Sequence, residues 1–289
     1  MSALRVALLQ WQIRPCAGLS GWAARLEREV AEAADHGARL LLLPEYSSLE
    51  MAAGTTPDIQ AELRVALDLA PSALEVAREV AWRHRVWLLP GTLPFRDGER
   101  IVNRAPLIAP SGRVAFQDKH VMTRFEAEDW HIDPGTPPAV FETPFGRIGI
   151  AICFDAEFPA LVRAQVEAGA WLILVPTCTD TMHGFNRVRI AAAARAMENQ
   201  CFVVIAPTVG DAPWCGTLDR NRGYAAAFGP VDRGFPEDGV LARGALDAAQ
   251  WVYADLDPAA LGSARRDGAV RNHLSWPPDP PPCKVVGLA

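Results

Sequence analysis

Three residues of reactive type each stand at the end of an apolar run in the sequence. Glu45 comes directly after the apolar run 38–44, Lys119 ends the run 114–119, and Cys153 follows the run 147–152. Short apolar runs of this kind are typical of buried strands, and α/β sheets present their ligand-binding groups at strand ends. Each of the three residues therefore stands where an α/β sheet could present a ligand-binding group.

These residue types could supply the parts of a nucleophilic hydrolase. Burial at the exit of an apolar strand raises the pKa of a carboxyl, which suits Glu45 to act as a general base. The Lys119 ammonium can stabilise developing negative charge, and a thiol on a tight strand-to-helix turn, such as Cys153, is exposed for attack. Taken singly, each residue also has a plainer interpretation, as a solvated glutamate, a surface lysine and an inert buried cysteine.

The elements that must position these residues alternate between helices and strands. Helical spacing of apolar residues predicts helices over 21–36, 59–84 (one helix, or two divided at Pro71), 159–168 and 186–200. Apolar runs bounded by turn residues predict strands over 4–10, 38–44, 86–93, 100–109, 114–119, 147–154, 171–176, 202–207, 224–228, 240–246 and 250–256. The strands between 86 and 119 follow one another too closely for a simple β-α-β repeat, so we expect mixed sheets. Strands recur without a linker, which predicts a single α/β domain over 1–275 and a Pro-rich C-terminal tail over 276–289.

Composition narrows the class of protein. The 289 residues carry 28 Lys and Arg against 34 Asp and Glu, a net charge of −6, which argues against nucleic acid as a partner. No apolar run approaches the roughly 18 residues of a membrane helix, so we expect no membrane partner. The six cysteines form no CxxC pair, and residues 1–9 are typical of a first strand rather than a secretory leader. These features predict a cytoplasmic protein with reduced thiols.

Taken together, the motifs around the three reactive residues resemble those of the nitrilase (carbon–nitrogen hydrolase) superfamily, in its amidase-like branch. The matching segments are LLLPE at 41–45, DKH at 118–120 with a downstream E-x5-PG, GIAICFDAEFP at 149–159, and RAMENQ at 195–200. The resemblance runs from Arg5 to about Leu256. It implies an αββα sandwich, no metal or organic cofactor, and assembly into a homodimer or higher homo-oligomer through helices near the nucleophile.

The resemblance also assigns roles by motif. Cys153 corresponds to the nucleophile, Glu45 to the general base, and Lys119 to the cation that faces the tetrahedral intermediate, with the backbone N–H of Phe154 beside it. The family's second glutamate is assigned to Glu128, which keeps the spacing to the Pro-Gly turn, and Glu126 is the alternative. The implied activity is hydrolysis of a small linear amide, through a thioester, to a carboxylic acid and ammonia or an amine.

Residues near the nucleophile indicate the substrate. True nitrilases tend to have Cys-Trp-Glu where this sequence has Phe154 and Asp155 after the cysteine, which favours amides over nitriles. Several relatives that bind carboxylated substrates have Arg at the position of Glu157, so we expect a substrate that is neutral or cationic there, unless Glu157 pairs with a neighbouring Arg. Thr177 and Asp180, in a polar loop, are candidate binding residues, and Trp130 is a candidate apolar wall.

Other interpretations of the sequence remain open. Hydrolysis of N-carbamoyl amines or nitriles could use the same three residues. A cysteine–histidine hydrolase would need His131 or His183 beside Cys153, and it would leave Glu45 and Lys119 unexplained. A non-catalytic interaction module could retain the fold, although the presence of all three reactive residues argues against it.

Overall fold

The computed structural model describes residues 3–54, 57–277, 283, 285 and 286. The helices in this part of the chain are α1 (Gly18–Asp35), α2 (Ile59–His84), α3 (Arg124–Glu128), α4 (Pro159–Glu167), α5 (Met182–Asn199), α6 (Pro258–Asp267) and α7 (Asn272–Ser275), with the 3-10 helices η1 (Ser47–Ala52) and η2 (Cys153–Glu157). The strands are β1 (Leu4–Gln12), β2 (Leu40–Leu42), β3 (Trp87–Leu89), β4 (Leu93–Asp97), β5 (Arg100–Ile108), β6 (Val114–Asp118), β7 (Val140–Thr143), β8 (Gly146–Ile150), β9 (Leu172–Thr177), β10 (Phe202–Asp211), β11 (Arg220–Asn221), β12 (Ala226–Phe228), β13 (Val240–Arg243) and β14 (Gln250–Leu256).

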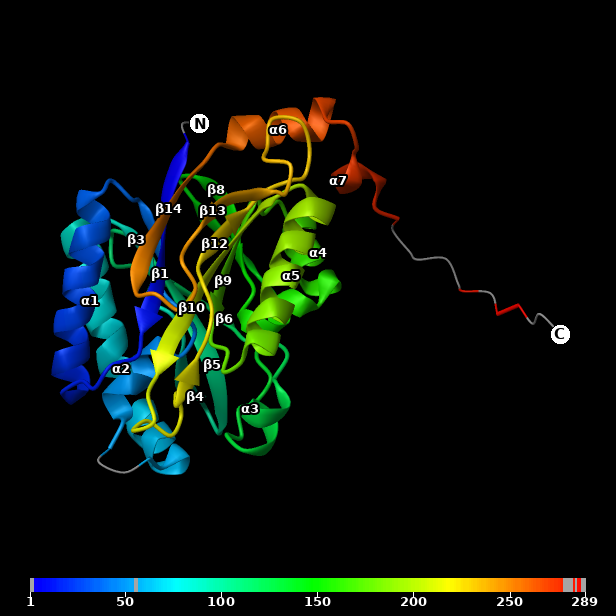
Figure 1. The fold of residues 1–289 in the computed structure, drawn as a ribbon. Coiled ribbons are helices and arrows are strands. Elements are labelled where there is room, and N and C mark those ends of the chain that lie inside the picture. The colour runs from blue at the N-terminus through cyan, green and yellow to red at the C-terminus, as the bar shows by residue number, and fades with distance from the viewer. Residues whose placement is uncertain (1–2, 55–56, 278–282, 284, 287–289) are drawn as a thin grey trace.

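The strands form one continuous mixed sheet that doubles back on itself into two layers. The first layer contains β14, β1, β2, β3, β5, β4 and β6, and the second contains β7, β8, β9, β10, β12 and β13. Strand β1 joins them, because it pairs with β2 at Val6↔Leu40 and with β10 at Trp11↔Thr208. Helices α1 and α2 cover the outer face of the first layer, and α4 and α5 cover that of the second (Figure 1). The expected αββα sandwich with mixed sheets is confirmed.

The two-sided burial of β1 explains why its sequence is almost continuously apolar. Leu4, Val6 and Leu8 belong to one hydrophobic core cluster with residues of the second layer such as Leu174. Alternate residues such as Leu9 belong to the core beneath α1 and α2. Because successive strand residues point to opposite faces, a strand covered on both faces needs apolar side chains at nearly every position.

Several predicted boundaries were wrong. The single strand expected over 86–93 is two strands, β3 and β4, separated by a turn in which Gly91 has φ +92°. A Cβ on Gly91 would lie 2.0 Å from the Pro44 carbonyl oxygen, so the chain passes the loop before Glu45 at a distance that only glycine allows. Residues 59–84 form one helix with Pro71 inside it, and strand β7 and helix α6 were not predicted.

The Pro-rich tail proposed for 276–289 lies largely outside the described residues. Trp276, at its start, packs against the Arg163 guanidinium at 4.9 Å from the ring centroid. Across the described segments, every helix is too short or too polar to cross a lipid bilayer.

Candidate active site

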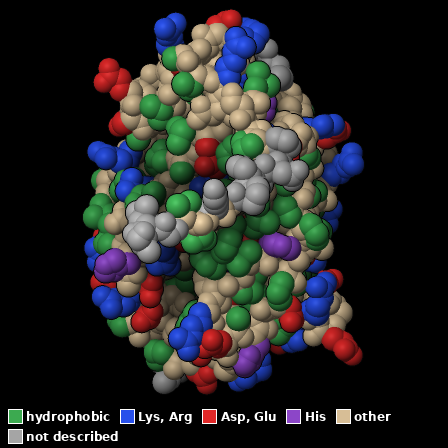
Figure 2. Space-filling model, turned by 90° about the vertical axis from the view of Figure 1, so that its right-hand side faces the viewer, with side chains coloured by type: hydrophobic (Ala, Val, Ile, Leu, Met, Phe, Trp, Pro, Cys, Tyr) green, Lys and Arg blue, Asp and Glu red, His purple; other side chains and the backbone are tan. Residues whose placement is uncertain are grey.

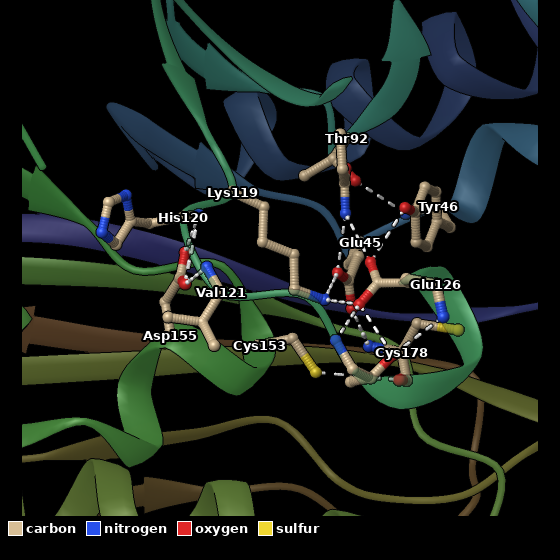
Figure 3. Close-up of polar contacts among 12 residues, drawn as sticks. Glu45, Tyr46, Thr92, Lys119, His120, Val121, Glu126, Cys153, Asp155 and Cys178 are labelled. Atoms are coloured by element: carbon tan, nitrogen blue, oxygen red, sulfur yellow. Dashed lines mark hydrogen bonds and ion pairs between the residues drawn. The ribbon is translucent and has the colours of Figure 1, made fainter. Parts of the chain in front are cut away.

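The three reactive residues line one pocket of about 350 Å³. Glu45 follows β2 and Lys119 follows β6, both in the first layer, whereas Cys153 begins η2 after β8 of the second layer. All three side chains are buried and point toward one another across the two layers (Figure 3). The structure thus brings the three strand ends to one pocket.

Lys119 lies between two carboxylates. Its Nζ is 2.8 Å from Oε1 of Glu45 and 2.6 Å from Oε2 of Glu126. The three charged groups are each no more than 3% exposed, so they interact with little screening by solvent. When all three groups are ionised, two carboxylates and one ammonium have a net charge of −1. The cluster can therefore take up a proton, which an acid–base site must be able to do.

Polar neighbours fix both carboxylates. The Asn103 side-chain amide donates to Glu45 Oε1 at 2.9 Å and to Glu126 Oε1 at 3.3 Å. The Tyr46 hydroxyl donates to Glu126 Oε1 at 3.0 Å, and the Thr123 backbone N–H and hydroxyl donate to Glu126 Oε2. Such a network holds the Glu126 carboxylate in one orientation beside Lys119.

The assignment of Glu128 as the second glutamate disagrees with the structure. Glu128 is 57% exposed and pairs with Arg124 at 2.8 Å, on the far side of α3 from Lys119. Glu126 occupies the expected place because Thr123 and Glu126 form a capping box at the start of α3, which turns the Glu126 side chain back toward the helix N-terminus. The Thr-x-x-Glu pattern at 123–126 was the sequence signal that could have identified it.

The Cys153 turn has an unusual backbone conformation. Cys153 has φ +47°, in the left-handed region that non-glycine residues rarely adopt, and its thiol donates to the Cys178 carbonyl oxygen at 3.7 Å. The Cys178 backbone N–H donates in turn to Glu45 Oε2 at 3.1 Å. The end of β9 therefore contacts both the thiol and the carboxylate.

Asp155 connects the Cys153 turn to the loop after Lys119. Its buried carboxylate accepts hydrogen bonds from the backbone N–H groups of His120, at 3.1 Å, and Val121, at 2.8 Å (Figure 3). Because these amides follow Lys119 directly, the contact fixes the lysine's backbone relative to the nucleophile turn. The sequence pattern indicated no such positioning role for Asp155.

Burial and mutual charge set the protonation of the site. Burial, together with the charge of Glu126, raises the pKa of Glu45 to about 7, although Lys119 opposes the shift. Burial alone would lower the pKa of Lys119, but Glu126 and Glu45 hold it well above its usual range. Lys119 and Thr123 lower the pKa of Glu126 in spite of its burial. Burial and Glu45 raise the pKa of Cys153 well above its usual range, so the resting cysteine is a neutral thiol.

The chain is similar to a known protein family and to solved structures. The carbon–nitrogen hydrolase model matches residues 5–266. The chain belongs to this family. An amidase of Nesterenkonia sp. AN1 from the nitrilase superfamily is 28% identical with a TM-score of 0.73, covering 91% of this chain and 95% of that one. Another structure of that amidase carries acrylamide added at its active-site cysteine.

Two curated relatives extend the comparison. The omega-amidase of Homo sapiens is 26% identical over 275 residues, covering 92% of this chain and 93% of that protein. The probable hydrolase YhcX of Bacillus subtilis is 28% identical over 271 residues, which are 93% of this chain and 52% of that protein. This chain therefore spans about half the length of YhcX. The expectation of a carbon–nitrogen hydrolase is confirmed.

The remaining predicted residues of this carbon–nitrogen hydrolase divide into two groups. Phe154, Glu157, Trp130 and Asp180 line the pocket. Thr177 does not line it, because its side chain is buried and its hydroxyl donates to the Ala206 carbonyl oxygen at 3.3 Å. Glu157 pairs with Arg187 at 3.3 Å, so the alternative of an ion pair with a neighbouring Arg is the one that the structure shows.

The cysteine–histidine alternative finds no support in the geometry. His131 and His183 are both exposed, and neither lines the pocket that contains Cys153. Over the described residues, no group of three His, Cys, Asp or Glu side chains is arranged to hold a metal ion. The polar groups that face Cys153 in this carbon–nitrogen hydrolase are Glu45, Lys119 and the backbone of Cys178.

Proposed function

We propose that the protein hydrolyses small linear amides to a carboxylic acid and ammonia or an amine, through a thioester on Cys153. One observation carries the proposal: Lys119 Nζ bridges Glu45 and Glu126 at 2.8 and 2.6 Å, in a pocket that the Cys153 thiol also lines. This arrangement supports the proposal, because a thiol, a carboxyl with a pKa of about 7 and a fixed cation around one space suit nucleophilic hydrolysis.

The acylation step follows from the protonation states of the site. Ionised Glu45 accepts the thiol proton as Cys153 Sγ attacks the amide carbon. Lys119 and the backbone N–H of Phe154 stabilise the negative charge that develops on the amide oxygen. The tetrahedral intermediate collapses with cleavage of the C–N bond, and protonated Glu45 returns its proton to the leaving nitrogen.

Hydrolysis of the thioester reuses the same groups. Glu45, again ionised, accepts a proton from a water molecule that attacks the thioester carbonyl. The second tetrahedral intermediate places its oxyanion where the first one lay, so Lys119 serves both steps. Collapse breaks the C–S bond and releases the carboxylic acid, and Glu45 returns its proton to the Cys153 sulfur, which restores the thiol and the ionised carboxylate. In this mechanism Glu126 positions Lys119 and keeps its ammonium charged.

The pocket supports an uncharged substrate. Tyr46, Phe125, Trp130 and Phe154 provide apolar lining, which suits an aliphatic or aromatic acyl group. Because Arg187 neutralises Glu157, that carboxylate gives no separate reason for a charge preference. N-carbamoyl amines and nitriles remain alternative substrates of the same three residues.

A substrate panel tests the proposal. Ammonia release would be measured with amides of two to six carbons, amides with a distal carboxylate, N-carbamoyl amines and nitriles, and intact mass would record any acyl adduct. We expect turnover of an uncharged amide by the wild type and by Cys283→Ala, whose thiol is exposed and outside the pocket, and none by Cys153→Ala. Turnover that persists in Cys153→Ala would refute the thioester mechanism. If the wild type released no ammonia from any compound of the panel, the result would favour a non-catalytic module.

Assembly and location form part of the same proposal. The protein is proposed to form a homodimer or higher homo-oligomer through α4 and α5, because α5 exposes Ile190 and Met197 on a face with hydrophobic side chains near its centre (Figure 2). Sedimentation equilibrium tests it: a monomer at micromolar concentration would contradict the assembly. A cytoplasmic location is supported by six cysteines that are all free thiols.

A further inference from the structure

A second buried carboxylate lies beside the pocket, outside the catalytic cluster. Glu62 is in the first turn of α2 and is 2% exposed. Its Oε1 accepts the Gly216 backbone N–H at 2.8 Å, and its Oε2 accepts the Thr217 backbone N–H and hydroxyl, each at 2.8 Å. The Cys215 thiol is 3.6 Å from the same Oε2. Four donors from three consecutive residues therefore converge on one side chain.

Amide and hydroxyl donors, rather than a cation, compensate the Glu62 charge. Within the described residues, none of the salt bridges includes Glu62, and its polar side-chain partners all come from 215–217. The first turn of a helix also favours a negative charge. Hydrogen bonds to an ionised acceptor are about twice as strong as neutral ones, so this contact holds the loop firmly against α2.

The loop that Glu62 holds is a wall of the pocket. Gly216, Thr217, Asp219 and Arg220 all line the space around Cys153. Contact with α2 is close at Gly216, where a Cβ would lie 3.1 Å from the Asp58 backbone nitrogen. A wall fixed in this way has a defined position, although its residues lie outside regular secondary structure up to Asp219.

We infer that Glu62 is a positioning residue that fixes the 215–220 wall and thereby sets which acyl groups the pocket accepts. The inference rests on the proposed amide hydrolysis for its kinetic readout. Glu62 does not touch the reacting atoms. Its loss should therefore change substrate binding and selectivity, whereas the chemical step at Cys153 should continue.

A comparison of two variants, Glu62→Gln and Glu75→Gln, tests the inference. Both remove one carboxylate from α2, and Glu75→Gln is the control because Glu75 is 64% exposed. The Glu62→Gln amide nitrogen cannot accept either backbone N–H. We expect KM for hexanamide to rise about tenfold, with kcat within about threefold. The rise should be smaller for acetamide, because its two-carbon acyl group extends less far from Cys153. Hydrogen exchange of the peptide 212–220 should accelerate in Glu62→Gln and stay unchanged in Glu75→Gln.

Two further measurements keep the inference testable. Gly216→Ala pushes the loop away from α2 without altering Glu62, so it should shift the hexanamide-to-acetamide ratio in the same direction even where Glu62→Gln does not fold. Alkylation of Cys153 by iodoacetamide and by its N-hexyl derivative, read by peptide mass mapping, reports the same wall without turnover. If the wild type hydrolyses no amide, the proposed function fails. The ratio of the two alkylation rates, compared between the wild type and Glu62→Gln, then tests the role of Glu62 without reference to amide hydrolysis.

Three results would overturn the role of Glu62. One is a fall in kcat with KM and chain-length selectivity unchanged. Another is unaltered exchange of 212–220 in Glu62→Gln. The third is an equal effect of Glu75→Gln on selectivity.

Discussion

Lys119 and Glu45 are 74 positions apart in the chain, and their Nζ and Oε1 atoms are 2.8 Å apart in the pocket. The ion pair is almost completely buried, so neither group is screened by water. Removing one partner of such a pair leaves the other charge buried and uncompensated, which is costly for the fold. Conservative changes that keep the shape of the side chain are therefore the informative ones.

The pKa of Glu45 predicts the pH dependence of the reaction. A general base must be ionised, and its pKa of about 7 means that kcat/KM should rise with pH, reach half of its plateau near pH 7 and level off above it. Glu45→Gln should lower kcat by about 10³-fold, because general base catalysis is lost, and its residual rate should no longer show this rise. A pH–rate profile of both proteins checks this, and an unchanged acidic limb in the variant would assign the limb to another group.

The same carboxyl should affect stability with the opposite sign. Its pKa in the folded protein lies above its usual value of 4.5, so the stability from protonated Glu45 is complete below pH 4.5 and is lost as the pH rises through about 7. We expect the Tm of the wild type to fall more between pH 5 and pH 8 than that of Glu45→Gln. If Tm changed with pH in the same way in both proteins, folding would not raise the pKa of Glu45.

Glu126 and Glu128 form a matched pair for mutation. Glu126→Gln removes the buried carboxylate beside Lys119 and should lower kcat/KM by about 100-fold, because charge-assisted hydrogen bonds are lost. Glu128→Gln breaks only an exposed pair with Arg124 and should stay within about twofold of the wild type. Steady-state kinetics on one amide would compare them. A larger effect at Glu128 would restore the assignment made from spacing alone.

Asp155 should matter for stability as well as for the site. In Asp155→Asn one oxygen becomes a donor that faces the N–H groups of His120 and Val121, which costs about 2 kcal/mol and lowers Tm by about 4 °C. Asp211→Asn, at an exposed strand end, is the control and should change Tm by less than about 1 °C. An equal change of Tm in the two variants would contradict the claim that Asp155 holds the Cys153 turn against the Lys119 loop.

The Glu157–Arg187 pair at the pocket mouth predicts how the enzyme treats acidic amides. Glu157→Gln frees Arg187 and should lower KM for an amide with a distal carboxylate by about threefold, an effect that salt would weaken. Uncharged amides should be unaffected. If both substrates responded alike, the change would reflect pocket shape rather than charge.

The sequence predicted the strand-end residues well because burial there leaves a simple pattern. Glu45, Lys119 and Cys153 each follow an apolar run, and the strands that carry these runs end around one pocket, β2 and β6 in the first layer and β8 in the second. The same reasoning does not reach Asn103. The β5–β6 register, in which Arg104 faces Asp118, places Asn103 beside Lys119, and register depends on tertiary pairing rather than on local spacing.

Short and irregular elements were the part that the sequence did not reveal. Strand β7, of four residues, and helix α3, of five, are too short to show a period. The second glutamate lies on α3, and the spacing to the Pro-Gly turn selected Glu128, whereas the Thr123–Glu126 capping pattern would have selected Glu126. Strand β4 was merged with β3 because the turn at Gly91 is set by contact with Pro44, 47 positions earlier in the chain.

The two sheet layers divide the reacting groups between them, with Glu45 and Lys119 on one and Cys153 and Cys178 on the other. Neither half of the sandwich contains a complete site, so catalytic competence emerges only when the halves have docked. A folding intermediate with one layer formed would have native-like secondary structure and no turnover. Activity in this enzyme therefore reports whether the two layers are docked. In mild denaturant, activity should be lost before the circular dichroism signal of the strands and helices is lost.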